Sequence, residues 1–374
     1  MARFSSVSWS IAAVLLVLSL PRATHAQTQV TTCGQAYTGL AYLVGDLDCS
    51  SSGEPFAVRL QGGATLDLAG FTLTSSTAGV LCDDQCTVLS SVAGGAIEGA
   101  GGFHFGVNAG RARILGVEIR GFQYGIYAFG LRGEDILVEG NERGIECHVR
   151  RLLLRRAVVR DNSLNGVIVD GGLSAVRAAI SDSTITGNGT NGIVFGSALG
   201  KKLVKIDGTE ISGNGSSGIA DFTVATVRDS VIDGNGAHGL DGFDARIAGS
   251  EITGNQQIGV HTVRATLASA TVTMNGVGGI GDPQSAPCDL DQKVRTKDST
   301  ISLNGEWGIW SCRPQLVAST LSGNGTAAGC GSSLACADVA SELAPALSDG
   351  ATCQTSYVAA SGIPGSNWGV CAAD

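Results

Sequence analysis

The sequence has no apolar run long enough to cross a membrane. A spanning helix needs about 20 consecutive apolar residues, and the most apolar segment covers only residues 11–20. That segment follows Arg3 and precedes Pro21 and a small-residue site at 24–26, and no cysteine follows it to accept a lipid anchor. This order is typical of a cleaved secretory signal peptide. We therefore expect residues 1–26 to be removed, the mature chain to begin at about Gln27, and the protein to be secreted (extracellular or periplasmic) without membrane insertion.

The sequence also lacks a surplus of positive charge, with 24 Lys and Arg against 33 Asp and Glu. This balance argues against a nucleic-acid partner, which would be held by contacts between basic side chains and phosphates. Proline is scarce, at 7 of 374 residues, whereas glycine is abundant at 55. Because 43% of the residues are hydrophobic, a disordered chain is excluded, and the glycines must serve a folded structure with many turns.

No segment of the mature chain carries the apolar period of a helix. Instead one motif recurs, in which Gly-Asn is followed by three residues, a glycine and an aliphatic residue. Its copies are "GNERGI" (140, one residue short), "DNSLNGV" (161), "GNGTNGI" (187), "GNGSSGI" (213), "GNGAHGL" (234), "GNQQIGV" (254), "MNGVGGI" (274) and "LNGEWGI" (303). The turn glycines recur every 19 to 29 residues between Gly125 and Gly308, which suits one solenoid turn per repeat.

The residues around each motif asparagine alternate like a strand with one buried face. The residue three positions before it is apolar in every copy (Val138, Val159, Ile185, Ile211, Ile232, Ile252, Val272, Ile301, Leu321), and the next residue is polar. The residue after each turn glycine is again aliphatic, so a second inward-facing strand starts there. Equivalent strands of successive coils would stack in parallel about 4.8 Å apart.

The turn asparagines would then stack as a ladder whose amides satisfy one another and the turn backbone. We interpret them as structural. Their place in the ladder argues against glycosylation of the sequons at Asn188, Asn214 and Asn324.

Three other folds do not fit. A leucine-rich repeat needs a helix, the calcium-binding nonapeptide solenoid needs an aspartate in the glycine motif, and a nucleotide-binding glycine loop occurs once, between a strand and a helix. We predict an all-β fold, a single-stranded right-handed parallel β-helix (solenoid) with disulfide-bonded caps at both ends. The N-terminal cap and β-helix would cover residues 27–326, and a disulfide-rich C-terminal cap residues 327–374.

The repeated pattern S-x-I-x-G-N-G-x-x-G-I resembles the parallel β-helix repeat of the pectate-lyase-like superfamily, and "GATLDLAGFTL" (63–73) resembles an early coil of its secreted members. The resemblance covers most of residues 55–326. The superfamily includes pectate lyases, polygalacturonases, alginate epimerases and lyases, phage tailspikes and non-catalytic surface proteins. Because the matching residues are architectural, the resemblance implies the fold and leaves the activity to be argued from the site.

The resemblance to pectate lyases implies an arginine or lysine that abstracts a proton beside a uronate carboxylate, with calcium bound by carboxylates. On the exposed strand before the asparagine, Arg160 is our candidate catalytic residue, and Glu210, Asp233 and Glu251 are candidate calcium ligands. The alternative interpretation is a solvated polar face on which Arg160 pairs with Glu139 one coil below.

Two departures from the repeat supply candidate substrate-binding residues. The 29-residue step contains the insertion "GDPQSAPCDLDQKVRTKD" (281–298), and the 26-residue repeats add a bulge near residue 201. Insertions in solenoids often map to the binding face. Lys201, Lys205, Lys293 and Arg295 are therefore our candidate contacts to an acidic glycan, with a charged strand edge as the alternative for the insertion residues. A groove beside the strand before the asparagine, walled by the insertion and lined with carboxylates and a lysine or arginine, would favour catalysis, whereas a smooth face would favour a scaffold.

Other chemistries are poorly supported. Ala237-His238-Gly239 and Arg246-Ile247-Ala248 only approach polygalacturonase motifs, and paired strand aspartates are absent. The four histidines after the predicted signal fall at different repeat positions, so we expect no histidine metal site. Threonine-rich strands such as 184–186 raise ice binding as a third possibility, although charged residues interrupt the threonine ladder.

All eleven cysteines follow the predicted signal, which suits an oxidising compartment. Proximity suggests five disulfides: Cys33–Cys49, Cys82–Cys86, Cys288–Cys312, Cys330–Cys336 and Cys353–Cys371. Cys147, three residues after Gly144 and thus inward-facing, would be the unpaired, inert thiol.

We therefore expect a secreted parallel β-helix protein that binds or processes an acidic polysaccharide by lyase-like or epimerase-like chemistry. The alternative is a non-catalytic extracellular structural or adhesion protein. The sequence leaves the oligomeric state open.

Overall fold

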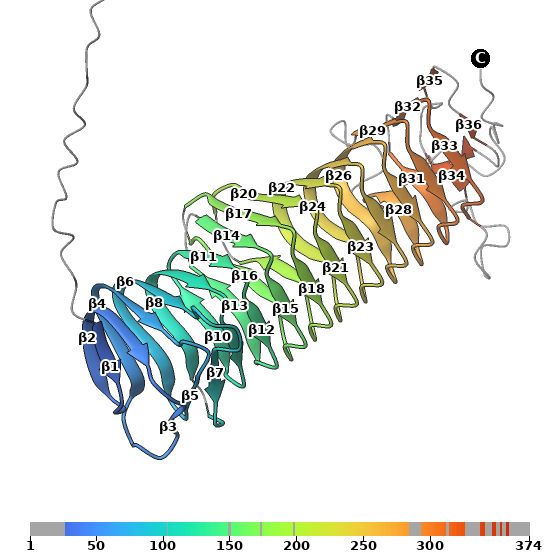
Figure 1. The fold of residues 1–374 in the computed structure, drawn as a ribbon. Coiled ribbons are helices and arrows are strands. Elements are labelled where there is room, and N and C mark those ends of the chain that lie inside the picture. The colour runs from blue at the N-terminus through green and yellow to red at the C-terminus, as the bar shows by residue number, and fades with distance from the viewer. Residues whose placement is uncertain are drawn as a thin grey trace, which may run out of the picture.

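The computed structural model describes residues 27–102, 104–148, 151–172, 174–196, 199–283, 293–311 and 314–325, together with four short strands between 337 and 358. These residues wind into an elongated solenoid of successive coils (Figure 1). The described part contains strands and no helix, and so no helix able to cross a membrane. The predicted signal peptide lies outside the described residues.

The narrower sheet has 14 parallel strands, and each coil contributes one short strand to it. They are β3 (Leu47–Cys49), β5 (Thr72–Ser75), β7 (Ala96–Gly99), β9 (Glu118–Arg120), β12 (Leu137–Glu139), β15 (Val158–Arg160), β18 (Thr184–Thr186), β21 (Glu210–Ser212), β23 (Val231–Asp233), β25 (Glu251–Thr253), β27 (Thr271–Thr273), β30 (Thr300–Ser302), β33 (Thr320–Ser322) and β36 (Thr352–Cys353).

The wider sheet has 23 strands. They are β1 (Gln27–Val30), β2 (Gln35–Leu43), β4 (Phe56–Asp67), β6 (Ala78–Leu89), β8 (Phe105–Leu115), β10 (Tyr124–Ala128), β11 (Leu131–Glu134), β13 (Arg143–Cys147), β14 (Arg151–Arg155), β16 (Val167–Val169), β17 (Val176–Ser181), β19 (Ile193–Phe195), β20 (Lys202–Asp207), β22 (Ile219–Arg228), β24 (Leu240–Ala248), β26 (Ile258–Ala268), β28 (Gly278–Gly281), β29 (Lys293–Lys297), β31 (Trp307–Trp310), β32 (Pro314–Val317), β34 (Ala337–Ala340), β35 (Ala346–Ser348) and β37 (Tyr357–Val358).

The wider sheet forms two strips. In most central coils a corner breaks the chain between them, as between β10 and β11, whereas β22, β24 and β26 run through both. The first strip follows the asparagine turn and includes β10, β13, β16, β19, β28 and the start of β26. The second strip includes β11, β14, β17, β20, β29 and the end of β26. With the 14-stranded sheet, the strips give the coil three faces.

The core confirms the predicted alternation. Ile185, Ile211, Ile232 and Ile252 align in register in the 14-stranded sheet and are fully buried. Burying one such side chain stabilises the fold by about 1.5–3 kcal/mol. The aliphatic residues after the turn glycines form a second buried column, of which Ile193 is a member.

The asparagine ladder is also confirmed. Asn188 donates from Nδ2 to Oδ1 of Asn214 at 2.9 Å, and the same bond joins successive turns from Asn141 to Asn324. Each of these asparagines is at most 3% exposed. The buried amides are therefore satisfied within the turn column.

The C-terminal strands carry the solenoid beyond residue 326. Strands β34, β35 and β36 pair in parallel with β31, β32 and β33, and β37 pairs with β34. The predicted boundary therefore does not mark the end of parallel pairing. Segments such as "ADVA" lack the glycine-asparagine motif, yet the exposed strand edges of the preceding coil still offer them hydrogen-bond partners.

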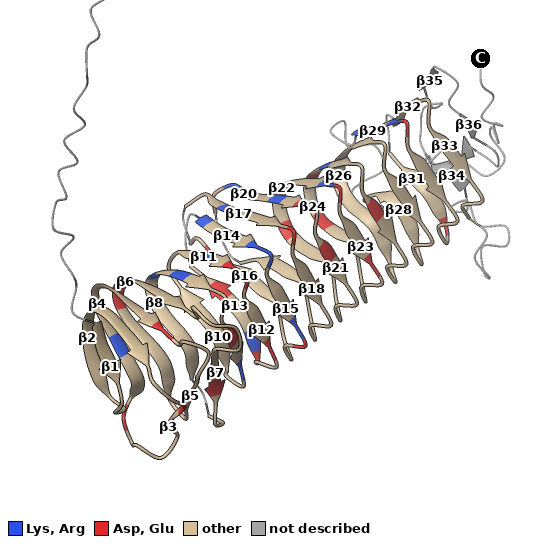
Figure 2. Ribbon diagram, in the orientation of Figure 1, with Lys and Arg blue, Asp and Glu red and all other residues tan. Residues whose placement is uncertain are grey.

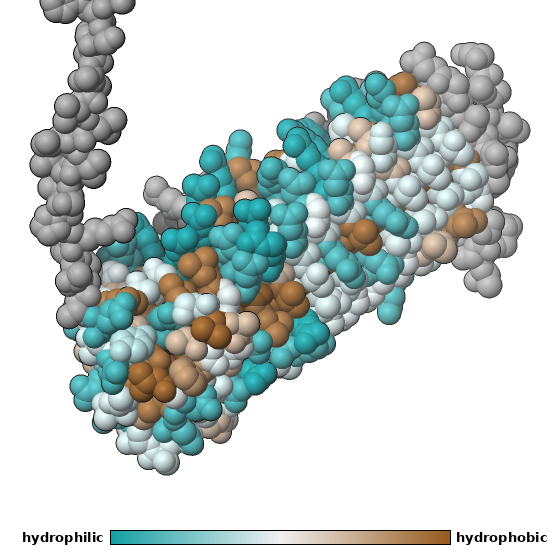
Figure 3. All heavy atoms as spheres, in the orientation of Figure 1, coloured by the Kyte–Doolittle hydropathy of each residue, from teal (hydrophilic) through white to brown (hydrophobic). Residues whose placement is uncertain are grey.

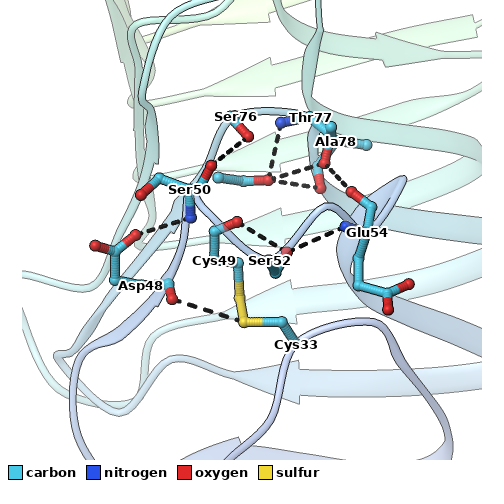
Figure 4. Close-up of a disulfide and its surroundings, with 10 residues drawn as sticks. Cys33, Asp48, Cys49, Ser50, Ser52, Glu54, Ser76, Thr77 and Ala78 are labelled. Atoms are coloured by element: carbon cyan, nitrogen blue, oxygen red, sulfur yellow. Dashed lines mark hydrogen bonds between the residues drawn. A yellow bond between two sulfur atoms is a disulfide. The ribbon is translucent and has the colours of Figure 1, made fainter.

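Two predicted disulfides are confirmed, Cys33–Cys49 and Cys82–Cys86. Figure 4 shows the first, beside Asp48, whose carboxylate accepts a hydrogen bond from the backbone N–H of Ser50. Cys147 is free and fully buried, as predicted. The other three predicted pairs, Cys288–Cys312, Cys330–Cys336 and Cys353–Cys371, involve side chains outside the described residues.

Candidate functional site

Arg160 lies at the end of β15 on the outer face of the 14-stranded sheet. Its Nη2 is 2.7 Å and its Nε 2.8 Å from Oε2 of Glu139 on the preceding coil. This is the ion pair expected if the exposed strand is only a solvated polar face. A guanidinium paired with a carboxylate remains protonated, so the geometry does not support Arg160 as a general base.

The three predicted calcium ligands lie on the same face, but the structure does not bring them together. Glu210 aligns with Val231, which aligns in turn with Glu251, so an apolar residue separates the two glutamates. Asp233 belongs to a different column, between Ser212 and Thr253. The calcium site stays a prediction.

The second strip of the wider sheet carries a row of basic side chains. The register places Arg113, Arg132, Leu153, Ala179, Lys205, Thr226, Arg246, Thr266 and Arg295 in one outward column. The outward column two residues earlier contains Arg151, Arg177, Leu203, Val224, Asp244, Arg264 and Lys293. The strip therefore gathers predicted substrate-binding residues from coils far apart in the sequence.

Two adjoining hollows lie on this strip. The first, of about 390 Å³, is lined by three basic residues, Arg132, Arg155 and Lys205, and by two acidic residues, Glu134 and Asp207. The second, of about 680 Å³, is lined by basic residues of β14, β17, β20 and β22. Both share Leu153, Ala179 and Lys205. These three residues lie where the two hollows adjoin. We call the two hollows together the cationic groove.

Most arginines of the cationic groove are uncompensated. Among the described residues, no carboxylate lies within 4.0 Å of Arg132, Arg151, Arg177 or Arg228. Lys205 makes only a 3.7 Å contact with Asp207. Figure 2 shows the blue segments of β14, β17, β20 and β22 along this side of the solenoid. Basic residues thus outnumber acidic ones along this strip, most clearly in the second hollow, although the chain has a formal net charge of −9.

The hollows are not on the face that the sequence analysis considered for catalysis. That face lies beside the strands that precede the asparagines, whereas the hollows lie on the second strip of the other sheet. Lys205 lines both hollows, and Lys293 and Arg295 lie further along the same columns. Lys201 is exposed just before β20 and lines neither hollow. Much of the insertion, residues 284–292, lies outside the described residues.

The sequence interpretation missed the other arginines of the groove because it aligned coils on the glycine-asparagine turn. Their own signal was present: Arg132 and Arg151, and then Arg177, lie about one coil apart in the sequence. A search for polar residues at the outward positions of the second strip, in addition to those before the asparagine, would have revealed the basic row.

The first strip carries an aromatic cluster near its N-terminal end. The ring of Phe105 stacks on Tyr124 with centroids 5.1 Å apart, and Tyr127 lies 5.2 Å from Phe105 and 4.9 Å from the ring of His148. Phe129, at the corner toward the second strip, is 53% exposed. Figure 3 shows brown, apolar atoms on the molecular surface in the region of β8, β10 and β13.

A buried carboxylate anchors the polar members of this cluster. Glu146 accepts a hydrogen bond from Nη1 of Arg143 at 2.8 Å, and its other oxygen lies 2.7 Å from Nε2 of His148. Arg143 also donates to the hydroxyl of Tyr124 at 3.1 Å. Burial, followed by the charge of Glu146, raises the pKa of Tyr127. Tyr127 and His148, whose rings are in contact, therefore place two ionisable groups together at an aromatic surface.

A second polar cluster lies further along the first strip. It brings together two histidines that the sequence analysis did not expect to form a site. The rings of His238 and His261 stack with centroids 4.4 Å apart. Nδ1 of His261 lies 2.8 Å from Asp241, and its Nε2 lies 3.1 Å from Asp282. The two histidines occupy different repeat positions, but neighbouring coils are close enough for their side chains to meet.

The two imidazoles are electrostatically distinct. Burial, with the positive charge of His261 as a further cause, lowers the pKa of His238 to about 4. Burial also opposes protonation of His261, but Asp241 and Asp282 outweigh it and raise the pKa of that ring.

Comparison with known proteins supports the fold alone. No family model matches the chain, and no curated protein does. A double mutant of the periplasmic alginate epimerase AlgG is 13% identical, with a TM-score of 0.51 over 87% of this chain and 85% of that chain. The A-module of the Azotobacter vinelandii mannuronan C-5 epimerase AlgE4 is 17% identical, with a TM-score of 0.45 over 85% of this chain and 91% of its own. The chain is a parallel β-helix repeat protein.

Proposed function

We propose that the protein is secreted and binds an acidic polysaccharide along the cationic groove. The observation that carries this proposal is the row of uncompensated arginines, in which Arg151 and Arg177 align on adjacent strands. Coils repeat about every 4.8 Å, so the groove presents positive charge at intervals along the solenoid axis. A linear polymer with a carboxylate on successive sugars is the ligand class that such a row matches.

The location of the charge supports a specific ligand. Exposed basic residues on an acidic protein usually pair with neighbouring carboxylates, as Arg160 does with Glu139. Arg132, Arg151, Arg177 and Arg228 have no such partner, and together they maintain a local positive potential on this strip, which attracts anions. The AlgG and AlgE4 structures are named as alginate and mannuronan epimerases, which is consistent with this class of ligand.

Export is supported by the two disulfides of the N-terminal coils, because such bonds persist in oxidising compartments.

Processing of the bound polymer is a second candidate function, supported by the arrangement of Tyr127, His148 and Glu146. Lyase and epimerase chemistry on a uronate needs one group that removes a proton beside the carboxylate and another that donates one. The Tyr127–His148 pair supplies two such groups, and Arg143 a positive charge. Phe105 and Tyr124 offer apolar ring faces for a sugar. Calcium, expected from the sequence, remains part of this proposal as a cation that would neutralise the substrate.

The binding proposal is tested by titrating the mature protein with alginate and pectate oligomers and with neutral dextran oligomers, using calorimetry. We expect the polyuronates alone to bind, with an affinity that falls as salt rises. The double variant Arg151→Ala/Arg177→Ala should bind at least about tenfold more weakly, since a hydrogen bond to a charged group is worth about 1.5–3 kcal/mol.

The matched control is Arg160→Ala/Arg156→Ala, which removes the same charge from residues outside the groove. Equal losses in the two double variants would contradict the proposal, because they would indicate a general charge effect. Binding of single-stranded DNA as tight as that of polyuronate would also contradict it, because the groove would then select charge alone.

A further inference from the structure

The cluster around His261 has the composition of a metal site. One ligand atom each from His238, Asp241 and His261 can be chosen so that all lie within 4.8 Å of one another. Among the described residues, this is the one group of three or more histidine, cysteine or acidic side chains with that property. The three residues come from the turn before β24, from β24 and from β26, so the stacking of two coils assembles them.

The donor set selects the class of metal. Two imidazoles and one carboxylate suit Zn²⁺, Co²⁺, Ni²⁺ or Cu²⁺, whereas Ca²⁺ and Mg²⁺ prefer oxygen ligands throughout. Nδ1 of His238 accepts a hydrogen bond from the backbone N–H of Ile258 at 3.3 Å, which leaves Nε2 as the nitrogen available to an ion. The torsion about the Cβ–Cγ bond of histidine is soft, so the rings can rotate toward a common ion.

Asp282 adds an orienting group. His261 has carboxylates at both ring nitrogens, Asp241 at Nδ1 and Asp282 at Nε2. When Nδ1 binds an ion, Nε2–H remains free to donate to Asp282. A histidine ligand that donates its other N–H to a carboxylate is the usual arrangement in metal sites, because the second bond holds the ring and raises its basicity.

The exposure of the cluster indicates an open site. The side chain of His261 is 16% exposed, that of Asp282 18% and that of Asp241 36%. An ion held by three protein ligands at such a half-buried surface keeps a coordination position for water or a ligand oxygen, unlike a closed four-ligand structural site.

We propose that His238, Asp241 and His261 bind one divalent transition-metal ion of the zinc class, with Asp282 orienting His261. The site is separate from the cationic groove and does not depend on glycan binding.

The experiment uses the full mature chain without a histidine tag, treated with a chelator and dialysed. Calorimetric titration with Zn²⁺ should give one equivalent of tight binding that excess Ca²⁺ or Mg²⁺ does not displace. Titration with Co²⁺ should give visible absorption bands of a nitrogen- and oxygen-ligated ion. His238→Ala and Asp241→Asn should each weaken Zn²⁺ binding at least about tenfold, and Asp282→Asn about 10–100-fold.

The control is His104→Ala, which removes a histidine remote from the cluster and should leave the affinity unchanged. Circular dichroism and the melting temperature establish that each variant is folded. If His238→Ala does not fold, Asp241→Asn, at a half-buried position, still provides the test. Zn²⁺ binding that survives both His238→Ala and Asp241→Asn, or that Ca²⁺ displaces, would overturn the proposal.

Discussion

Asn235 donates a hydrogen bond from Nδ2 to Oδ1 of Asn255 at 2.9 Å, and the backbone N–H of Asn235 donates to the same oxygen at 3.1 Å. One carboxamide oxygen thus satisfies two buried donors of the preceding coil. Through its own Nδ2, Asn255 reaches back to the carbonyl of Ile232 at 3.2 Å. Each asparagine therefore ties together the turns and strands of adjacent coils.

Replacing one member of this ladder should destabilise the solenoid strongly. Asn255→Ala leaves the buried donors of Asn235 and the carbonyl of Ile232 without their partner, and each unsatisfied buried group costs about 1–3 kcal/mol. We expect the free energy of unfolding to fall by roughly 2–5 kcal/mol in denaturant titrations. Gln256→Ala, at the exposed neighbouring position, should change it little. Similar losses in the two variants would show that the ladder bonds are not the cause.

The two glycines of the repeat should respond differently to substitution. A Cβ on Gly239 would lie 2.6 Å from the carbonyl oxygen of Gly259 and 2.9 Å from Nδ2 of Asn255, whereas a Cβ on Gly234 meets nothing within 4 Å. Gly234 has φ 60°, a conformation that Asp161 and Met274 adopt at equivalent turns.

We therefore expect Gly239→Ala to cost about 1–3 kcal/mol through overpacking, and Gly234→Asn to cost less than about 1 kcal/mol, since asparagine tolerates the left-handed region. Thermal unfolding of the two variants provides the comparison. A larger loss for Gly234→Asn would contradict the close-approach argument.

Cys147 should be chemically inert while the protein is folded. Burial raises the pKa of its thiol to about 12, and the reactive thiolate is the minor form below that value. At pH 8 the native protein should show no labelling of Cys147 by iodoacetamide, and labelling should appear on unfolding, as followed by peptide mass spectrometry. Rapid labelling of Cys147 in the folded protein would contradict the buried placement.

Arg160 and the Tyr127–His148 pair offer a direct test of where any catalysis occurs. If the protein cleaves or epimerises a polyuronate, Tyr127→Phe and His148→Ala should each reduce kcat by about 100-fold or more, as expected for loss of a general acid or base. Arg160→Ala should leave kcat unchanged.

The measurement is ultraviolet absorbance of unsaturated products together with NMR of the uronate configuration, with and without calcium. Loss of activity in Arg160→Ala with full activity in Tyr127→Phe would instead support the catalytic role expected from the sequence. Tight binding without any product would leave a non-catalytic polysaccharide-binding protein.

The solenoid was predictable because its determinants are local and repeated. Each coil from Asn141 to Asn324 carries its own turn asparagine and its own buried aliphatic residue, and most carry a glycine where the next coil approaches. The ladder, the parallel register and the burial of Cys147 all follow from the position of a residue within a single repeat.

The sites were less predictable because they depend on lateral neighbours. Arg160 and Glu139 pair as the sequence permitted, but Val231 separates Glu210 from Glu251, a consequence of register that the spacing of acidic residues along the chain does not reveal. The C-terminal strands lack the motif and pair through backbone groups, which carry no sequence signal.

The sequence by itself determined that this chain coils, which residues face the core, and where each turn lies, because repeat period and alternation are properties of the chain. Only the tertiary structure decided which surface residues meet. Stacking coils about 4.8 Å apart brings Arg151 beside Arg177 and His238 onto His261, residues separated by a whole coil in the sequence. The cationic groove and the proposed metal ligands therefore arise from the stacking of coils, and no single repeat contains either site.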